Sequence, residues 1–425
     1  YTLGCKVNQY ESQAMEQALR ARGHAVVPFA EEADAYIVNT CSVTAVSDQK
    51  SRQVIHGVQR KHPGAVVAVC GCYPQTHVDD VRKLGVDLIA GTGDRTGFLR
   101  LLEETAAEKR HIEAIDQPFE RRVFEVLPAG GLEGRTRAML KVEDGCVNFC
   151  TYCIIPYARG RVRSLPIPTA VEQTRALAAE GYREIVVTGI EISSWGQDLK
   201  NGETLIDLLE AVCAAAPAVR IRLGSLEPRT ITEDFCRRAA ALPNLCPQFH
   251  LSMQSGCDAT LKRMNRKYDT ARYAQSVALL NQYFAHPAVT TDLITGFPEE
   301  TEEEFAQTLD FVRKCAFSAL HIFPYSRRTG TPAASMPGQV PRSVKEERAR
   351  RAAAVAEELH RNYLAACVGA VYPVLFEQPK DGRYFGHAPN YMEVLADGTD
   401  LHNQVRNVKI TGTDGASLLG ELLED

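Results

Sequence analysis

Three cysteines lie in one short stretch of this chain, at Cys146, Cys150 and Cys153. Thiolates at this Cys-x3-Cys-x2-Cys spacing can bind one [4Fe–4S] cube, because a short irregular loop lets three side chains converge. The cube has four irons, and the next cysteine along the chain is Cys213. One iron would therefore keep an open coordination site, as a catalytic metal does. A zinc loop or three buried thiols are the alternatives, but zinc sites usually pair two Cys-x2-Cys units, and a second pair is missing here.

The cysteine loop resembles the signature of the radical S-adenosylmethionine (SAM) enzymes. In that superfamily the open iron chelates the amino and carboxylate groups of the methionine part of SAM. The resemblance implies that Cys146, Cys150 and Cys153 hold the catalytic cluster. Tyr152, just before the last cysteine, matches the position of the aromatic side chain that lies against the adenine of SAM.

The length and composition of the chain limit its class. Its 425 residues suggest two or three domains, and 45% hydrophobic with 24% charged residues is ordinary for a soluble globular protein. No apolar run approaches the ~20 residues of a membrane span, and we find no secretory signal peptide. Thirteen cysteines in such a chain indicate a reducing compartment and metal–sulfur chemistry. We therefore expect a cytoplasmic protein with no membrane partner. We also expect that a few native residues precede Tyr1.

The charge of the chain is unevenly distributed. The net charge is −5, and residues 367–425 alone carry nine acidic and four basic groups, so the other 366 residues sum to zero. A basic face would therefore have to be local. One candidate set surrounds the cysteine loop, although a solvated surface explains it equally simply: Arg135, Arg137, Lys141, Arg159, Arg161 and Arg163.

Residues 1–115 alternate between expected strands, such as 36–41 and 66–70, and expected helices, such as 11–22 and 45–61. Such alternation predicts a doubly wound parallel sheet with helices on both faces. Ligands bind such sheets at the carboxyl ends of the strands. Three cysteines each fall just past an expected strand, so they could meet there as metal ligands or could simply be small buried residues: Cys5, Cys41 and Cys72. Cys70 lies inside its strand, out of phase with Cys72, and is the weaker candidate.

A linker is expected over 116–134, with two prolines and a Gly-Gly pair, and a longer series of strand–helix units follows. Strands are expected at 138–142, 184–188, 220–223, 248–253, 289–294 and 319–323, with helices such as 169–180, 205–215 and 301–315 between them. Six such units predict a partial (β/α)6 barrel with its active site at the carboxyl ends of the strands. Four residues at or just past those ends are expected to contact SAM, although turn chemistry also explains them: Gly189, Ser225, Gln254 and Gly296.

The last part of the chain changes period. Residues 342–366 are rich in Arg, Glu and Ala and predict a helix that leads to a new domain. From Val371 onward, short strands alternate with turn residues at 374–376, 383–386, 391–395 and 404–410. A small antiparallel β-barrel of about five strands fits this length.

Taken together, the three parts resemble the methylthiotransferases of the radical SAM superfamily over essentially the whole chain. The motifs that carry the resemblance are Thr2 to Ser12, Asn39-Thr40-Cys41-Ser42-Val43, Gly71-Cys72-Tyr73, the cysteine loop with Ile155 to Gly160, His250 to Gly256, and Thr291 to Pro298. The resemblance implies that Cys5, Cys41 and Cys72 bind a second, auxiliary [4Fe–4S] cluster, and that the last domain is a tRNA-binding TRAM domain. The acidic charge of that barrel and the extra Cys70 depart from the family pattern. The expected domains are 1–118, 132–366 and 367–425.

The opening Thr2-Leu3-Gly4-Cys5-Lys6-Val7-Asn8 is similar to that of enzymes acting on N6-threonylcarbamoyladenosine, as is the segment from Gly386 to Tyr391. Relatives acting on isopentenyladenosine usually read Thr-Phe-Gly-Cys-Gln-Met-Asn. Those that modify a ribosomal-protein side chain usually read Ser-Leu-Gly-Cys-Pro-Lys-Asn. The resemblance thus favours methylthiolation at carbon 2 of threonylcarbamoyladenosine 37 in the tRNA anticodon loop, with the two other substrates as alternatives.

The resemblance also implies a mechanism. An aromatic C–H bond has no acidic proton and no leaving group, so a radical cofactor is needed to activate it. The cluster on Cys146, Cys150 and Cys153 would pass an electron, from a donor such as flavodoxin or ferredoxin, to SAM and release a deoxyadenosyl radical. A second SAM would supply the methyl group, and the auxiliary cluster would hold the sulfur. Arg159 and Arg266 are possible partners for the carboxylate of the substrate, or they could bind RNA phosphate.

Overall fold

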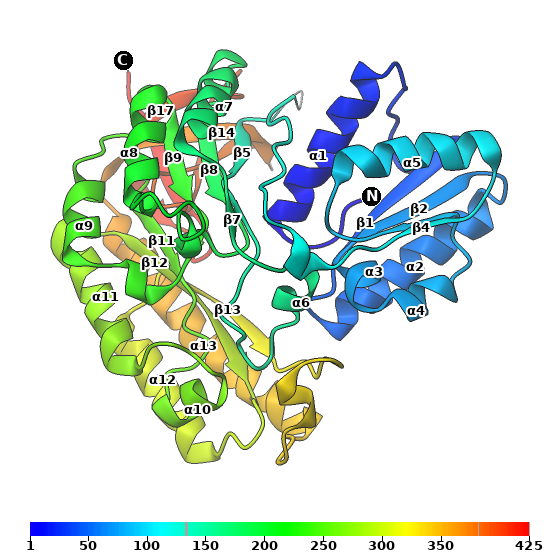
Figure 1. The fold of residues 1–425 in the computed structure, drawn as a ribbon. Coiled ribbons are helices and arrows are strands. Elements are labelled where there is room, and N and C mark those ends of the chain that lie inside the picture. The colour runs from blue at the N-terminus through cyan, green and yellow to red at the C-terminus, as the bar shows by residue number, and fades with distance from the viewer. Residues whose placement is uncertain (132–134, 381, 425) are drawn as a thin grey trace.

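The computed structural model describes residues 1–131, 135–380 and 382–424 (Figure 1). The last residues of the expected linker, 132–134, which include the predicted start of the second domain, fall outside these ranges. None of the helices in the described ranges combines the length and the apolar character needed to cross a membrane.

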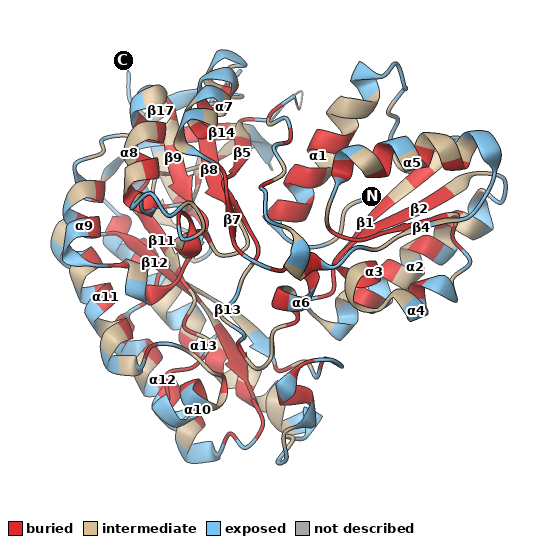
Figure 2. Cartoon of the chain, viewed as in Figure 1, coloured by how far each residue is buried: buried red, intermediate tan, exposed pale blue. Residues whose placement is uncertain are grey.

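A four-stranded parallel sheet forms the first region, as predicted. Its strands lie in the order β1 (Ala35–Thr40), β2 (Val66–Gly71), β3 (Leu88–Ala90) and β4 (Ile112–Ala114). One face packs against α2 (Ala45–Lys61), α3 (Cys72–Thr76) and α4 (Val78–Arg82). The other face packs against α1 (Lys6–Ala21) and α5 (Arg95–Glu108). The sheet strands are largely buried, as Figure 2 shows, because helices cover both faces.

Helix α1 begins five residues earlier than the sequence pattern predicted. Its first turn is polar, yet Asn8 is buried, and its side-chain amide donates hydrogen bonds to the carbonyls of Leu3 and Thr40 at 2.9 and 2.8 Å. A search for apolar residues at helical spacing does not detect this first turn of α1. Its residues are held by hydrogen bonds to the chain around the sheet rather than by an apolar face.

Six parallel strands form the central sheet: β5 (Arg137–Lys141), β8 (Glu184–Thr188), β9 (Arg220–Leu223), β11 (Gln248–Leu251), β12 (Ala288–Thr295) and β13 (Ala319–Pro324). A parallel bridge between Ile221 and Leu245 joins the two halves of this sheet. Around it lie α7 (Ile167–Ala179), α8 (Leu205–Ala215), α9 (Glu233–Ala240), α10 (Asp258–Arg263), α11 (Thr270–Tyr283), α12 (Glu302–Cys315) and α13 (Arg342–Cys367). The largest hydrophobic core of the described chain fills the space between the strands and these helices. This arrangement agrees with the predicted partial barrel.

Short elements connect the regions. β6 (Glu143–Asp144) pairs with β7 (Arg163–Ser164), and between them lie the cysteine loop and α6 (Ile155–Arg159). The short strand β10 (Ser225–Leu226) pairs with β11. The 3-10 turns are η1 (Pro118–Glu120), η2 (Ile192–Ser194), η3 (Pro228–Thr230) and η4 (Pro332–Ser335).

The last region is a closed five-stranded barrel, as predicted. Its strands are β14 (Val371–Lys380), β15 (Arg383–His387), β16 (Glu393–Ala396), β18 (Leu418–Leu422) and β17 (Val405–Thr413), in that order around the barrel. The strand expected from 391 begins at Glu393 instead, because Tyr391 closes a turn with φ +67°.

That turn docks the barrel on the central sheet. The Tyr391 ring stacks on His387 and lies under the guanidinium of Arg222, 4.6 Å from its centroid. Arg222 also donates to the Pro389 carbonyl at 2.8 Å, and Arg137 forms an ion pair with Glu377 at 2.8 Å. Arg137 and Arg220 begin β5 and β9, and Arg220 donates to the barrel carbonyls of Pro373 and His387, so the barrel sits opposite the edge where the active site is expected.

Candidate active site

The cysteine loop is held in shape by backbone hydrogen bonds. The N–H of Cys146 donates to the Gly160 carbonyl at 3.0 Å, and that of Cys153 donates to the Cys150 carbonyl at 2.9 Å. Gly145 has φ +95°, and a Cβ there would lie 1.9 Å from the Arg161 carbonyl oxygen. Only glycine therefore allows the two ends of the loop to approach this closely.

The three thiols of this loop share one protein-enclosed space. Burial raises the pKa of Cys146, and the charges of Cys153 and Cys150 raise it further. Burial likewise raises the pKa of Cys153 to about 12, with Cys150 adding to the effect. The guanidinium of Arg266 donates to the Cys150 Sγ at 3.1 Å. Free thiols would stay protonated here, so thiolates at this loop need a metal cluster to stabilise them.

The second group of cysteines is assembled by the sheet. β1 and β2 pair in parallel with Thr40 beside Gly71, so Cys41 and Cys72, the next residues, leave the sheet side by side. A parallel bridge between Thr2 and Asn39 brings Cys5 to the same edge. This is the carboxyl end of the strands, where ligands of such sheets bind.

Close packing joins Cys5 to Cys41. Gly4 has φ +105°, and a Cβ there would lie 2.7 Å from the Cys41 Cβ and 2.9 Å from its Sγ. Burial raises the pKa of Cys72 to about 12; the charge of Arg159 lowers it, and Cys41 and Cys5 raise it. The three thiols are therefore neighbours.

Cys70 occupies a different environment. Its side chain is fully buried in the core between the sheet and helices α1 and α5, with Met15, Phe98 and Leu102 among its neighbours. The charges that act on its pKa, after burial, come from Arg95 and Glu11 rather than from other cysteines. The predicted reason for this separation from Cys72 is wrong, because residues two apart in one strand share a face. The chain instead leaves β2 at Gly71, which has φ +102°, and Cys72 begins α3.

Both groups have the chemistry of cluster ligands. Within the described ranges, no three His, Cys, Asp or Glu side chains lie close enough together to hold one metal ion. Each thiolate of a [4Fe–4S] cube binds a different iron, so its ligands stand further apart than those of a single ion. Near the second group, the Asn39 Oδ1 and the Arg159 Nε atoms are buried without a hydrogen-bond partner. Three convergent thiols with free polar groups beside them fit a cube better than a zinc ion.

The other residues expected to contact SAM occupy strand ends, and their role stays a prediction. Gly189 follows β8 beside Glu143, and Ser225 begins β10 with its side chain exposed. Gln254 follows β11 with φ +68°, and Gly296 follows β12 with φ +69°. A Cβ on Gly296 would lie 2.4 Å from the Lys345 Cγ, which gives this glycine a packing role as well.

Tyr152 lies against an apolar group that includes Phe297, Met264 and Tyr325. Its ring meets the edge of Phe297 with centroids 6.5 Å apart, and its hydroxyl lies 3.4 Å from the Arg266 guanidinium. The ring is thus held beside the cysteine loop, next to the only arginine that contacts a thiol of that loop among the described residues.

Two carboxylic acids beside this loop were not predicted, the buried Glu143 and the half-buried Glu191. Glu143 is fully buried and accepts a hydrogen bond from the backbone N–H of Glu191 at 2.7 Å. Burial raises the pKa of Glu143 well above its usual range and that of Glu191 to about 7. Neither has a sequence signature, because the same residue types line many solvated turns.

The predicted basic surface is wrong for its central members. Lys141, Arg159 and Arg163 are buried, and their partners are Glu11 and Asp144. Arg137 pairs with Glu377, while Arg135 and Arg161 are exposed. Arg159 has no exposed surface left for a substrate carboxylate, so that suggestion is also wrong.

Two family models match the chain. Residues 1–91 match the Uncharacterized protein family UPF0004, and residues 140–312 match the Radical SAM superfamily. The fold resembles that of the radical SAM methyltransferase TsrM from Kitasatospora setae, with a TM-score of 0.57 and 17% identity over 76% of this chain and 72% of that one. It also resembles the cobalamin-dependent SAM radical enzyme OxsB, with a TM-score of 0.53 and 12% identity over 85% of this chain and 55% of that one.

Curated relatives align over nearly the whole chain. The threonylcarbamoyladenosine tRNA methylthiotransferase MtaB of Bacillus subtilis is 39% identical over 96% of this chain and 92% of its own length. The MtaB of Thermotoga maritima is 37% identical over 88% and 85%. A tRNA-2-methylthio-N(6)-dimethylallyladenosine synthase of Clostridium botulinum is 34% identical over 99% and 95%. With both cysteine groups in place on this fold, the chain belongs to the radical SAM methylthiotransferase family.

Proposed function

We propose that this protein is a tRNA methylthiotransferase that adds a methylthio group to carbon 2 of N6-threonylcarbamoyladenosine 37 in the anticodon loop. The observation that carries the proposal is the pair of three-cysteine groups, one at the carboxyl edge of the first sheet and one in the loop between β6 and β7. Relatives named threonylcarbamoyladenosine tRNA methylthiotransferase are 36 to 39% identical, whereas relatives named for dimethylallyladenosine are 33 to 35% identical.

Each cysteine group has its own task in this proposal. Cys146, Cys150 and Cys153 hold the cluster that cleaves SAM reductively, and Cys5, Cys41 and Cys72 hold the auxiliary cluster that carries the sulfur. Arg266, which donates to both Cys150 and Tyr152, orients the loop and adds positive charge beside it. Cys150 is buried and Cys146 and Cys153 are half-buried, which limits contact of this loop with water.

An exposed aromatic surface beside the cysteine loop supports an RNA substrate. Phe149 stacks parallel to Phe119 at 6.1 Å and meets the edge of Tyr157 at 6.0 Å, and both Phe149 and Tyr157 are about 40% exposed. Arg122 and Arg161 are exposed on the same surface. Among the described residues they form no ion pair, and they hydrogen-bond only to backbone carbonyls, including that of Phe119. Unpaired RNA bases stack on such aromatic side chains while arginines bind the phosphates.

Lys6 is the residue that best supports selection of the threonylcarbamoyl group. It follows Cys5 directly, is exposed, and forms no hydrogen bond or ion pair with another described residue. Burial lowers the pKa of Lys6, and the charges of Arg222 and Arg137 lower it further against the effect of Glu184. A free ammonium group beside the sulfur site can bind the carboxylate of the threonyl group, whereas a prenyl group offers it nothing.

The remaining parts of the proposal concern partners. A flavodoxin or a ferredoxin supplies the electron, the reaction takes place in the cytoplasm where tRNA is found, and the C-terminal barrel is a TRAM-like tRNA-binding domain. Because the barrel has an acidic balance, shape and local residues would carry that contact rather than bulk charge.

Direct competition tests the choice of substrate. Purified, reconstituted enzyme receives equal amounts of two tRNAs, one bearing threonylcarbamoyladenosine and one bearing isopentenyladenosine, and nucleoside mass spectrometry measures the products. We expect methylthiolation of the first tRNA, and at least a tenfold loss with the Lys6→Gln variant while SAM cleavage persists. Methylthiolation of the prenylated tRNA alone would refute the substrate, and modification of a ribosomal protein alone would refute the RNA class.

A further inference from the structure

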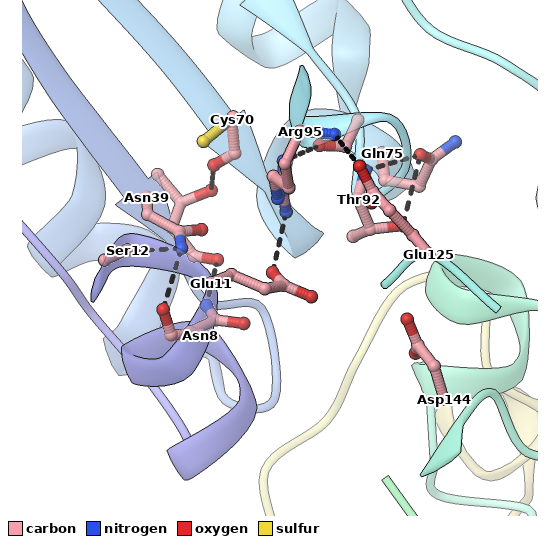
Figure 3. A network of polar contacts seen from close by, with 12 residues as sticks. Asn8, Glu11, Ser12, Asn39, Cys70, Gln75, Thr92, Arg95, Glu125 and Asp144 are labelled. Atoms are coloured by element: carbon pink, nitrogen blue, oxygen red, sulfur yellow. Dashed lines mark hydrogen bonds and ion pairs between the residues drawn. The ribbon is translucent and has the colours of Figure 1, made fainter. Parts of the chain in front are cut away.

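A buried network of charges lies between the two cysteine groups. The Glu11 carboxylate accepts hydrogen bonds from the Arg95 guanidinium at 2.8 Å, the Lys141 ammonium at 3.0 Å and the Arg159 guanidinium. Asp144 accepts from Lys141 at 2.8 Å and pairs with Arg163 at 3.3 Å. We call these six residues the Glu11 network. Figure 3 shows part of this network. A dashed line joins Glu11 to Arg95, and Asp144 lies apart from them on the facing segment.

The Glu11 network joins the two parts of the chain that carry the cysteines. Glu11 lies on α1, six residues after Cys5, and Arg159 ends α6, six residues after Cys153. Both side chains are almost completely buried. Their ion pair therefore ties the helix that follows one cysteine group to the helix that follows the other.

Arg159 also reaches the backbone that presents the auxiliary cysteines. Its guanidinium donates to the Asn8 Oδ1 at 2.8 Å. The Asn8 amide in turn donates to the carbonyl of Leu3 and to that of Thr40, the residue before Cys41. One arginine thus contacts the residue that organises the loops of Cys5 and Cys41.

The charges of the Glu11 network do not balance. It has four cations and two carboxylates, all of them buried. The half-buried Glu125, on which Arg95 and Lys141 act, adds a third carboxylate, which leaves one positive charge. The neighbouring cations hold the pKa values of Glu11 and Asp144 well below their usual range, so both carboxylates are already ionised. Unmatched buried charge is costly. An anionic group nearby would offset it, and α6, which ends at Arg159, packs against α3, which begins at Cys72.

We propose that Arg159, held in place by Glu11, is a positioning residue for the auxiliary site: it fixes Cys5, Cys41 and Cys72 relative to α6 and stabilises the anionic group that these cysteines bind. This inference rests on the proposed function, because it takes an anionic iron–sulfur cluster as the occupant. The charge of the surroundings and the hydrogen bonds near the sulfurs set the reduction potential of such clusters. The Glu11 network should therefore be visible in that potential.

The test measures the reduction potential of the auxiliary cluster alone. The background is the full chain with Cys146, Cys150 and Cys153 changed to Ala, reconstituted with iron and sulfide and titrated with dithionite, which supplies one electron to the cluster. In this background Arg159→Gln removes a positive charge and should lower the potential. A tenfold change in the reduction equilibrium, which is 59 mV for one electron, is the expected size.

Glu11→Gln gives the sign test. It removes a negative charge from the same buried place, so it should raise the potential. Arg163→Gln is the matched control, because Arg163 is equally buried but contacts Asp144 and not Asn8 or Glu11. Its effect should be the smallest of the three. Arg159→Lys should restore most of the parental potential, since it restores the charge.

A second measurement does not depend on the cluster. In the metal-free full chain, Arg159→Gln should make the first sheet and the central barrel unfold in two separate calorimetric transitions, while Arg163→Gln should keep the parental pattern. This readout remains available for a variant that assembles no cluster.

The outcomes separate this inference from the proposed function. No cluster in the parental background would overturn the ligand assignment and, with it, this inference. The electrostatic role alone would be overturned if Arg159→Gln and Glu11→Gln shifted the reduction potential of the cluster in the same direction. It would also be overturned if neither variant shifted that potential. Unchanged unfolding of metal-free Arg159→Gln would overturn the positioning role.

Discussion

The two cysteine groups reach similar geometry by opposite routes. Cys146, Cys150 and Cys153 come from one loop, whose ends are joined by the hydrogen bond from Cys146 to Gly160. Cys5, Cys41 and Cys72 come from three separate segments that meet only because β1 pairs with β2 and with the chain around Thr2. The first group depends on local backbone, and the second depends on the whole sheet.

Their electrostatic surroundings differ as well. Cys146 lies near Glu191, whose charge raises the thiol pKa further after burial has done so. Cys72 lies near Arg159, whose charge lowers its pKa against the effect of burial. Both sites face an arginine, Arg266 at Cys150 and Arg159 at Cys72, but only the first also faces an acid with a raised pKa, Glu191.

The largest expected effect is on SAM cleavage. Changing Cys146, Cys150 and Cys153 to Ala should abolish 5′-deoxyadenosine formation, because the loop can no longer hold the cluster that would bind and reduce SAM. Chromatographic assay with dithionite as reductant measures it. Retained reductive cleavage in this variant would refute the assignment of the loop as the radical site.

Changing Cys5, Cys41 and Cys72 to Ala should separate the two groups. We expect 5′-deoxyadenosine formation to persist, because the loop is built without those segments, while methylthiolated nucleoside falls below detection. Cys70→Ala is the matched control, since its thiol is equally buried but lies in the other core. A loss of product in Cys70→Ala comparable to that in Cys72→Ala would show that the ligand set is wrong.

Glu191→Gln tests the acid beside the loop. The pKa of Glu191 rises in the folded chain to about 7 from 4.5, so its stabilising effect is present below pH 4.5 and is lost as pH rises through 7. Glutamine cannot ionise, so the metal-free variant should be more stable than the parent at pH 8, by up to about 3 kcal/mol, and similar at pH 4.5. Urea unfolding at both pH values measures this. A difference that is the same at both would contradict it.

Gly4→Ala should give the smallest effect, confined to the auxiliary group. The new Cβ would need φ +105° and would meet Cys41, so we expect a loss of about 2 kcal/mol in unfolding free energy. Gly23→Ala is the control, because Gly23 has φ +88° but no atom within 4 Å of its would-be Cβ. Equal losses in the two variants would mean that the contact with Cys41 contributes nothing.

The sequence predicted what is local or periodic. The loop spacing located the first cysteine group, and alternation of strands and helices located both sheets and the C-terminal barrel. Helices α2 and α8 and strands β8 and β9 agree with their predicted bounds. These features were accessible because each depends on neighbouring residues and on a simple period.

The ion pairs between the first region and the central region could not be predicted from the sequence. Lys141, Arg159 and Arg163 look like surface residues by type, and only the fold shows that Glu11 and Asp144 meet them in the interior. Glu11 was visible within the opening motif, but its partner lies 148 residues away. A single sequence carries no period or spacing that links such residues.

Iron analysis of three proteins tests the central claim most directly. After reconstitution, the parent should bind about eight irons and eight sulfides per chain, and each of the two triple-alanine variants about four. The claim of two independent cysteine groups with one cluster each predicts that the two losses are equal and additive. About four irons in the parent, or loss of all iron in either triple variant, would contradict it.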